Sequence, residues 1–278
     1  MKHFVRRMYG AAKRVFPACG FDAQAIAFNM FFSFFPLLLL ALGIVGFSKT
    51  LQQAVLNLLS DVHWVLPPGS RRLFMEFLAA QEQKSRTLLT LGFGGLLLAG
   101  TQMMTAFQQA FRHIYREPPE THFWREQARA LLLLLLTIGP MLVAIVITVF
   151  GRTLRNWMIV HLGLPELFNA VWVLVYLGLG LVAAVIVLSL LYHAGRAHTQ
   201  SWNEALPGAL VATLLWWVVN WAFGIYVRRV PYNVVYGGLA AAIGLMIWMY
   251  LCAMVILIGA AFNAERLAER SSFSSSTG

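Results

Sequence analysis

The chain has 278 residues, of which 59% are hydrophobic and only 12% are charged, and its formal net charge is +10. Soluble domains carry about 25% charged residues, so this composition excludes an ordinary soluble protein and predicts an integral membrane protein. Nucleic acid is not an expected partner, because Lys and Arg are spread over every loop and no soluble module presents them. We expect the positive charge to meet anionic lipid headgroups instead.

The first twenty residues are basic. Phe4, Met8, Ala12 and Val15 recur at helical spacing, with Lys and Arg largely on the other side. This pattern predicts an amphipathic helix over residues 1–20 that lies on the membrane surface. A solvated basic tail is the alternative.

The first long apolar run covers residues 23–47 and contains no charge. About twenty apolar residues span a bilayer, so the run predicts a transmembrane helix, and it is too long for a cleaved signal peptide. Asp22, Asn29, Ser33 and Pro36 fall on one face of this helix. In lipid a polar face is turned toward other helices or a wet cavity, so we expect either a cavity wall or helix packing here.

Five further apolar segments predict five further spans, at about 88–107, 131–150, 167–192, 206–226 and 234–262. The loop at 50–86 has apolar residues at helical spacing and predicts short amphipathic helices on the outer surface. The expected fold is therefore an all-α integral membrane protein with six transmembrane helices in one membrane domain, residues 21–265. The serine-rich tail, 266–278, is expected to be disordered.

The second span also has a polar face, which includes Gln102, Thr105 and Gln108 and ends at Arg112. Together with Asn29, Ser33, Pro36 and Asn263, these uncharged residues are predicted to border one polar cavity that opens toward the cytoplasmic leaflet. Arg112, Glu265 and Asp22 are expected at the same level, as contacts for lipid headgroups. The alternative is that the polar residues only form hydrogen bonds between helices, and that Arg112 extends its charged end to the membrane–water interface.

No catalytic, cofactor or metal site is expected. No acidic or basic residue lies deep inside a predicted span, which disfavours an ion-driven pump. The chain lacks a glycine-rich phosphate loop and a metal-binding histidine pair, and its two cysteines, Cys19 and Cys252, suit neither a disulfide framework nor a zinc site.

Three motifs resemble the YihY, or virulence factor BrkB, family of bacterial inner-membrane proteins. They are "FNMFFSFFPLLLL", "LLTLGFGGLLLAGTQMMTAFQQAFRHIYR" and "YGGLAAAIGLMIWMYLCAMVILIGAAFNAE". The resemblance implies six spans, an inner-membrane location and cytoplasmic termini. Two positions depart from the family pattern: Asn29 stands where tyrosine is common, and Ala261 stands where glutamate is typical. Members have carried a ribonuclease label, which no residue constellation in this sequence supports, so we expect no enzyme.

Two functions remain open from the sequence. The first is transport or facilitated movement of a lipid or amphiphile across the inner membrane. The second is a structural or partner-binding role, with the same polar faces used for packing, in a homo-oligomer or with other envelope proteins. An intramembrane enzyme is a weaker third interpretation, which would need an acid pair assembled by folding.

The distribution of positive charge predicts that both termini are cytoplasmic. Lys and Arg concentrate on the cytoplasmic side of spans, and Lys2, Arg6, Arg7, Lys13 and Arg14 precede the first span, whereas only Lys49 follows it closely. A reporter fused to the C-terminus should therefore be active when it is a cytoplasmic reporter and inactive when it requires export. Activity of an exported reporter at that position would contradict this topology.

Overall fold

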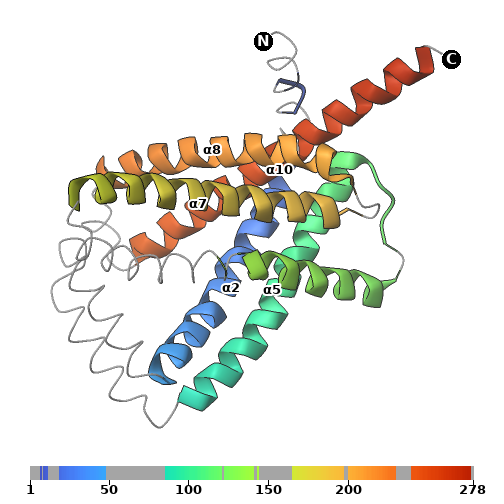
Figure 1. The fold of residues 1–278 in the computed structure, drawn as a ribbon. Helices are drawn as coiled ribbons and strands as arrows, with labels where there is room; N and C mark the ends of the chain where they lie inside the picture. The colour runs from blue at the N-terminus through green and yellow to red at the C-terminus, as the bar shows by residue number, and fades with distance from the viewer. Residues whose placement is uncertain are drawn as a thin grey trace. The chain divides into compact units, whose positions relative to one another are not determined.

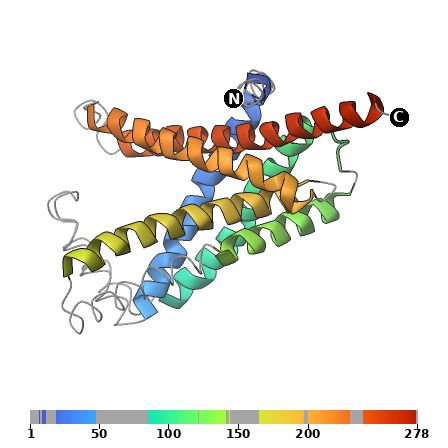
Figure 2. The same cartoon turned by 45° about the horizontal axis from the view of Figure 1, so that its top comes forward.

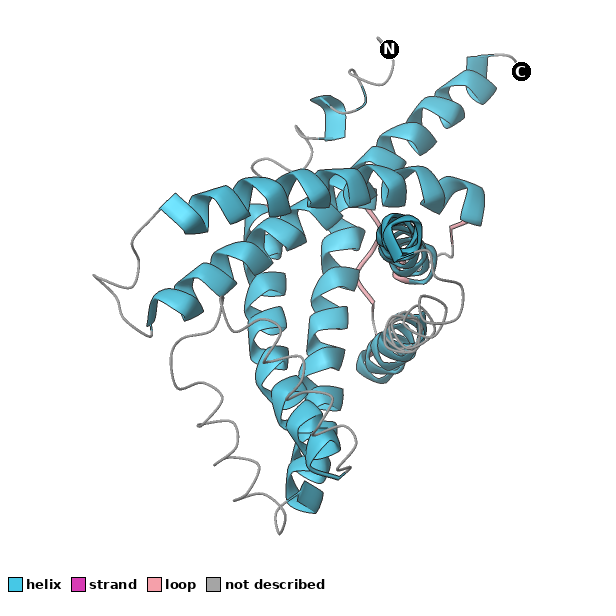
Figure 3. Cartoon of the chain, turned by 60° about the vertical axis from the view of Figure 1, so that its left-hand side comes forward, coloured by secondary structure: helices cyan, strands magenta, loops and turns pink. Residues whose placement is uncertain are grey.

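The structure is a computed structural model that describes residues 7, 9–11, 19–47, 85–120, 122–140, 143, 165–196, 200–229 and 239–276 (Figures 1 and 3). Its named helices are α2 (Gly20–Phe47), α5 (Ser85–Tyr115), α7 (Pro165–Ala194), α8 (Trp202–Arg229) and α10 (Leu239–Ser276). Residues 123–140 are also helical, and no strand occurs in the described ranges. The predicted all-α class is confirmed.

Within the described ranges, four helices are long and apolar enough to cross a membrane: Gly20–Gly46, Arg86–Tyr115, Trp202–Tyr226 and Ala242–Arg270. A shorter apolar helix, Gly178–Ala194, forms the second half of α7. Nearly half of the predicted third span, which is mainly its second half, and the whole predicted helical part of the outer loop lie outside the described residues. The count of six spans and the amphipathic outer helices therefore remain predictions.

The chain divides into two units, one formed by Met1–Phe28 with Met104–Gly278 and the other by Asn29–Met103. In the second unit, α2 and α5 lie side by side and touch through their backbones. A methyl group on Gly92 of α5 would come within 2.5 Å of the Leu40 amide nitrogen and 2.8 Å of its Cα. Only glycine permits this approach, which brings the two helices as close as small-residue packing in membranes allows.

In the first unit, α8 packs against both α7 and α10 (Figures 1 and 2). The crossing of α8 and α10 is centred on Gly208 and Gly259. A methyl group on Gly208 would overlap the Gly259 carbonyl oxygen, and one on Gly259 would overlap the Tyr192 hydroxyl of α7. The Tyr192 hydroxyl is placed there because it donates to the Ile256 carbonyl oxygen over 2.8 Å. These contacts hold α7, α8 and α10 together at one level.

Helix α10 continues to Ser276, whereas the sequence analysis predicts a disordered tail from residue 266. The segment that follows Asn263 is rich in Ala, Glu, Leu and Arg, which are strong helix formers. Two ion pairs also link this segment to other parts of the chain. Glu269 pairs with Arg7 of the N-terminal segment at 2.7 Å, and Arg270 pairs with Glu204 of α8 at 3.6 Å. Composition and these contacts together extend the helix beyond the apolar span.

The glycine crossing yields a prediction with a matched control. Gly208→Ala forces a methyl group into the α8–α10 contact and should lower the free energy of unfolding by about 1 to 3 kcal/mol. Gly244→Ala, also in α10, meets open space within 4 Å and should leave that free energy unchanged or raise it slightly. Unfolding of the detergent-solubilised protein by a denaturing detergent measures both. Equal effects of the two substitutions would contradict the close crossing.

Candidate functional site

Three residues of the predicted polar face on α2, Asn29, Ser33 and Pro36, lie in the second unit, and the fourth, Asp22, lies in the first. The Ser33 hydroxyl is buried and donates to the carbonyl oxygen of Asn29 on its own helix over 2.7 Å. Pro36 lies against α5, where a methyl group on Gly95 would come 3.0 Å from the Pro36 Cβ. In this unit, Ser33 is therefore satisfied locally, and Pro36 contributes to helix packing.

The predicted polar face of α5 is shared between the two units. Gln102, in the second unit, is exposed. Thr105 and Gln108, in the first unit, are both buried. Gln108 is 2% exposed, and its Oε1 atom has no hydrogen-bond partner among the described residues. Whether the α2 and α5 residues border one cavity remains a prediction, because Thr105 and Gln108 belong to a different unit from the α2 residues.

Asn263 is fully buried and joins α10 to α8. Its Oδ1 accepts from the Gly208 amide over 2.8 Å, and its Nδ2 donates to the Ala205 carbonyl oxygen over 3.0 Å. These two bonds flank Pro207, a residue inside α8 that cannot donate a backbone hydrogen bond. One turn further along α10, Arg266 donates to the Asn203 carbonyl oxygen over 3.5 Å. In a regular helix the Asn203 carbonyl oxygen would accept from the backbone N–H of residue 207. Proline has no N–H, so Arg266 supplies a donor in its place.

Two predicted headgroup contacts, Asp22 and Glu265, have neighbours inside the first unit. The Asp22 carboxylate lies 3.0 Å from Nδ1 of His113. Burial, and secondarily the charge and hydrogen bond of Asp22, raise the pKa of the Cys19 thiol to about 11, so this thiol is protonated at neutral pH. Glu265 lies against the N-terminal segment, where a methyl group on Gly10 would come 3.2 Å from its Cδ.

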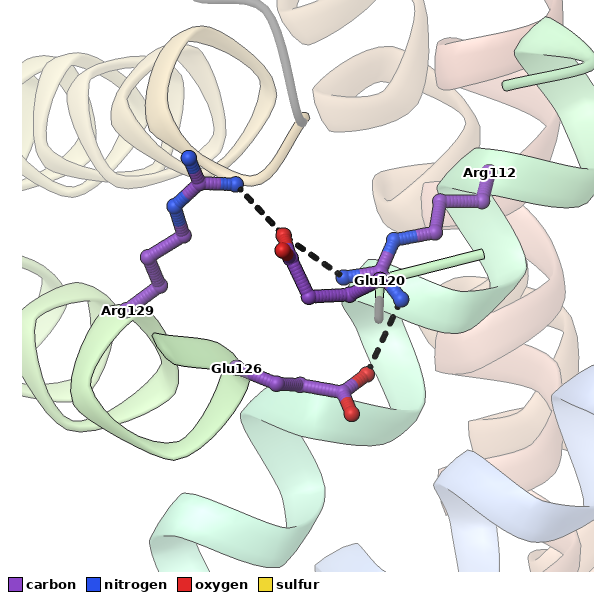
Figure 4. Close-up of polar contacts among 4 residues, drawn as sticks. All are labelled: Arg112, Glu120, Glu126 and Arg129. Atoms are coloured by element: carbon purple, nitrogen blue, oxygen red, sulfur yellow. Dashed lines mark hydrogen bonds and ion pairs between the residues drawn. The ribbon is translucent and has the colours of Figure 1, made fainter. Parts of the chain in front are cut away.

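The third predicted headgroup contact, Arg112, is buried in a cluster of charges (Figure 4). Its guanidinium lies 3.0 Å from Glu126 and 4.0 Å from Glu120. Glu120 also pairs with Arg129 at 3.0 Å. Both glutamates come from the stretch that follows α5, and they neutralise the arginine within the protein. The stretch "REPPETHFWREQAR" mixes Glu and Arg residues, which indicates ion pairing, but it does not specify Arg112 as a partner.

The turn that ends α5 directs the chain back over the helix. Arg116 has a left-handed backbone with φ of 56°, and the Glu117 amide donates to the Arg112 carbonyl oxygen over 2.9 Å. This is the hydrogen-bond pattern of a Schellman cap, which satisfies a carbonyl group at the helix end. The cap leaves Glu117 facing the end of α7, where its Oε1 accepts from Nε and Nη2 of Arg196 over 2.8 and 2.6 Å.

A second group of side chains surrounds Tyr115, and we call it the Tyr115 cluster: Tyr115, Glu117, Arg196 and Gln200. The Arg196 guanidinium lies 3.8 Å above the Tyr115 ring, in the geometry of a cation–π contact. The Tyr115 hydroxyl donates to Oε1 of Gln200 over 3.3 Å. Sequence reasoning missed this cluster because its members come from α5, the end of α7 and the residues before α8.

Three buried polar atoms have no hydrogen-bond partner among the described residues: Oε1 of Gln108, Oγ of Ser189 and Nε2 of Gln200. The rings of Phe111 and Tyr192 meet at 5.7 Å between centroids. Gln108 and Ser189 each precede one of these rings by three residues, or about 4.5 Å along their helices. Both therefore lie within about one helical turn of the place where α5 and α7 meet. Buried polar groups are normally paired, so this place is suited to a polar guest such as water or a ligand group.

The chemistry of this region is that of neutral hydrogen-bonding groups below a layer of paired charges. In the described part of the chain, no group of three or more His, Cys, Asp or Glu residues could hold a metal ion. Amide and hydroxyl groups can exchange hydrogen bonds with a guest without the cost of burying a net charge. Four predicted site residues belong to this region: Thr105, Gln108, Arg112 and Asn263. The structure adds Ser189 and the Tyr115 cluster, which includes Gln200.

Comparison with known proteins gives several similar sequences. A protein of Bacillus subtilis named ribonuclease-like protein YfkH is 27% identical over 242 residues, which cover 86% of each chain. UPF0761 membrane proteins of Alkalilimnicola ehrlichii and Stenotrophomonas maltophilia are each 26% identical over 88% and 89% of this chain. The matched regions are 54% and 57% of these two proteins, so the chain spans little more than half of their length. No solved structure shows a significant match.

The sequence profile of one family, virulence factor BrkB, matches residues 18–276. This range includes all three motifs on which the sequence resemblance rests, and it contains the four apolar helices long enough to cross a membrane. The resemblance is thereby confirmed: the chain belongs to the virulence factor BrkB family of membrane proteins.

Proposed function

We propose that this protein facilitates the movement of a lipid or similar amphiphile across the bacterial inner membrane, with both of its termini in the cytoplasm. The observation that carries the proposal is the set of three buried polar atoms, on Gln108, Ser189 and Gln200, for which the described residues offer no hydrogen-bond partner. A moving headgroup must exchange its hydrogen bonds with water for hydrogen bonds with protein. Buried donors and acceptors that have no protein partner are suited to that exchange.

The charge of these groups also favours a transient guest. A full charge buried on the path would cost several kcal/mol or hold an opposite charge too tightly, whereas an amide or hydroxyl solvates a headgroup reversibly. The charged residues of this region, Arg112 and Arg196, are already paired with glutamates. Lipid headgroups, anionic ones in particular, are the partners that this proposal names, and the basic segment 1–20 would meet them at the cytoplasmic surface.

A second candidate is a structural or partner-binding role without transport. Asn263 favours it, because this predicted cavity residue uses both ends of its amide to join α10 to α8. Ser33 favours it too, since its hydroxyl bonds to its own helix. On this alternative the polar residues set the packing of the bundle, and the protein acts through oligomers or other envelope proteins.

A lipid-scrambling assay separates the two candidates. Purified protein is reconstituted into vesicles that contain a fluorescent lipid, and the fraction of that lipid accessible to an external quencher is followed over time. Wild type should make lipid from both leaflets accessible. Gln108→Leu combined with Ser189→Ala should abolish this movement while the protein remains folded and inserted, because the exchange groups of α5 and α7 are gone.

Thr213→Val is the matched control. Thr213 is buried in α8, but its hydroxyl donates to the Ala209 carbonyl oxygen of its own helix over 2.8 Å, so it offers nothing to a guest. This variant should move lipid as wild type does. Absence of movement by wild type would leave the structural role as the better account. If the double variant moves lipid at the wild-type rate, Gln108 and Ser189 do not contribute to lipid movement.

A further inference from the structure

The Glu117 carboxylate accepts hydrogen bonds from Arg196 in the way that the oxyanion of a bound ligand would. Two nitrogens of the guanidinium, Nε and Nη2, converge on a single carboxylate oxygen over 2.8 and 2.6 Å. The side chains are largely buried, with 7% of Glu117 and 15% of Arg196 exposed. The guanidinium carbon also lies 3.8 Å from the centre of the Tyr115 ring, so its position does not depend on the carboxylate alone. A pre-oriented, shielded guanidinium is the usual protein ligand for phosphate and carboxylate groups.

Gln200 supplies a second, independent feature of the same place. Its Oε1 accepts from the Tyr115 hydroxyl, which fixes the amide beside the ring that Arg196 covers. Its Nε2 is buried and has no hydrogen-bond partner within the described ranges, and the residue as a whole is 2% exposed. An unused buried donor is costly to keep, and an acceptor from outside the protein would satisfy it.

We propose that Arg196 and Gln200 form a binding site for a phosphate oxyanion, and that Glu117 is a built-in competitor which fills the site in its absence. The oxyanion would accept from Nε and Nη2 of Arg196 and from Nε2 of Gln200 while the Glu117 carboxylate is displaced. This deepens the proposed function, on which it rests for the origin of the ligand, by naming an anionic phosphate headgroup as the substrate class.

The balance of charge makes such an exchange feasible. Arg196 with Glu117 is a neutral pair, so a phosphate diester that replaces the carboxylate leaves the local charge as it was. The displaced Glu117 lies on the connection between α5 and the helix at 123–140, outside both helices. Its release therefore needs no break in either helix. A free phosphate carries the same oxyanion chemistry, and the experiment must distinguish the two sources.

Calorimetric titration of the full chain in uncharged detergent tests the site, with inorganic phosphate as the first probe and chloride at matched ionic strength as the blank. Glu117→Gln removes the competing charge and should bind phosphate about tenfold more tightly than wild type, since a hydrogen bond to a charged group is commonly worth that factor. Arg196→Gln should abolish binding. Gln200→Leu keeps the ion pair, and it should weaken binding severalfold in both the wild-type and the Glu117→Gln background.

Glu269→Gln is the matched control, because it makes the same charge change beside Arg7, whose side chain is 29% exposed. It should bind phosphate no better than wild type. Equal gains from Glu117→Gln and Glu269→Gln would overturn the site, as would the absence of binding in every variant. If Glu117→Gln fails to fold, the comparison of wild type with Gln200→Leu decides, and identical affinities overturn the proposal.

Two soluble short-chain lipids identify the source of the oxyanion. Dihexanoyl phosphatidylglycerol should bind more tightly than inorganic phosphate and lose its affinity in Arg196→Gln, whereas tighter binding of inorganic phosphate would assign the site to the free ion and refute the headgroup. Phosphatidylcholine of the same chain length, whose ammonium offsets its phosphate, should bind more weakly. If the protein binds phosphate but moves no lipid in vesicles, the binding site is upheld and the transport proposal is contradicted. If wild type binds no phosphate and Arg196→Gln still moves lipid, the transport proposal is upheld and the binding site is contradicted.

Discussion

A bilayer offers no hydrogen-bond partner to the polar groups inside it, and this constraint governs how the helices of this protein meet. Asn263 illustrates the result, because its amide joins α10 to the Gly208 and Ala205 backbone of α8 on either side of a proline. The Tyr192 hydroxyl joins α7 to the Ile256 carbonyl oxygen of α10 in the same way. Each interhelical bond contributes only about 0.6 kcal/mol, so the bonds select a particular register more than they add stability. The close contact of Gly208 with Gly259 requires that register.

Charges obey the same constraint at the ends of α5 and α7. Arg112 and Arg196 are largely shielded from solvent. Arg112 pairs with Glu120 and Glu126 (Figure 4), and Arg196 pairs with Glu117. All three glutamates come from the chain that follows α5. Ion pairs of this kind add little net stability, because the cost of removing two charges from water offsets their attraction. Their effect is to fix where the connection between α5 and the next helix lies. Gln108 and Ser189 precede these two arginines by four and seven residues, and their polar atoms have no hydrogen-bond partner in the described part of the chain.

The sequence predicted the features that depend on local pattern, and it could not predict those that depend on distant partners. Long uncharged runs located α2, α5, α8 and α10, because apolar length alone determines what can cross a bilayer. The partners of Asn263 lie 55 and 58 residues away, and no local periodicity reports them. For Arg112 the sequence suggested a contact with a lipid headgroup, and it did not reveal the ion pair with Glu126, fourteen residues further on. Predicting that pair required the turn at Arg116, and a left-handed arginine has no reliable sequence signal.

We proposed that a lipid headgroup moves between α5 and α7, past the polar groups of Gln108 and Ser189. The most direct test of this path is whether a cysteine placed along it can be reached by a water-soluble reagent. In a background with Cys19 and Cys252, both buried, replaced by alanine, Ser189→Cys is compared with Thr213→Cys by reaction with a small water-soluble maleimide. Both positions are buried, but the Ser189 hydroxyl has no hydrogen-bond partner among the residues that the structure describes, whereas the Thr213 hydroxyl donates to a carbonyl oxygen of its own helix. A thiol reacts as its thiolate, which requires a polar environment. We predict reaction at position 189 and none at 213 in membranes, and equal protection of both thiols would contradict a polar path between α5 and α7.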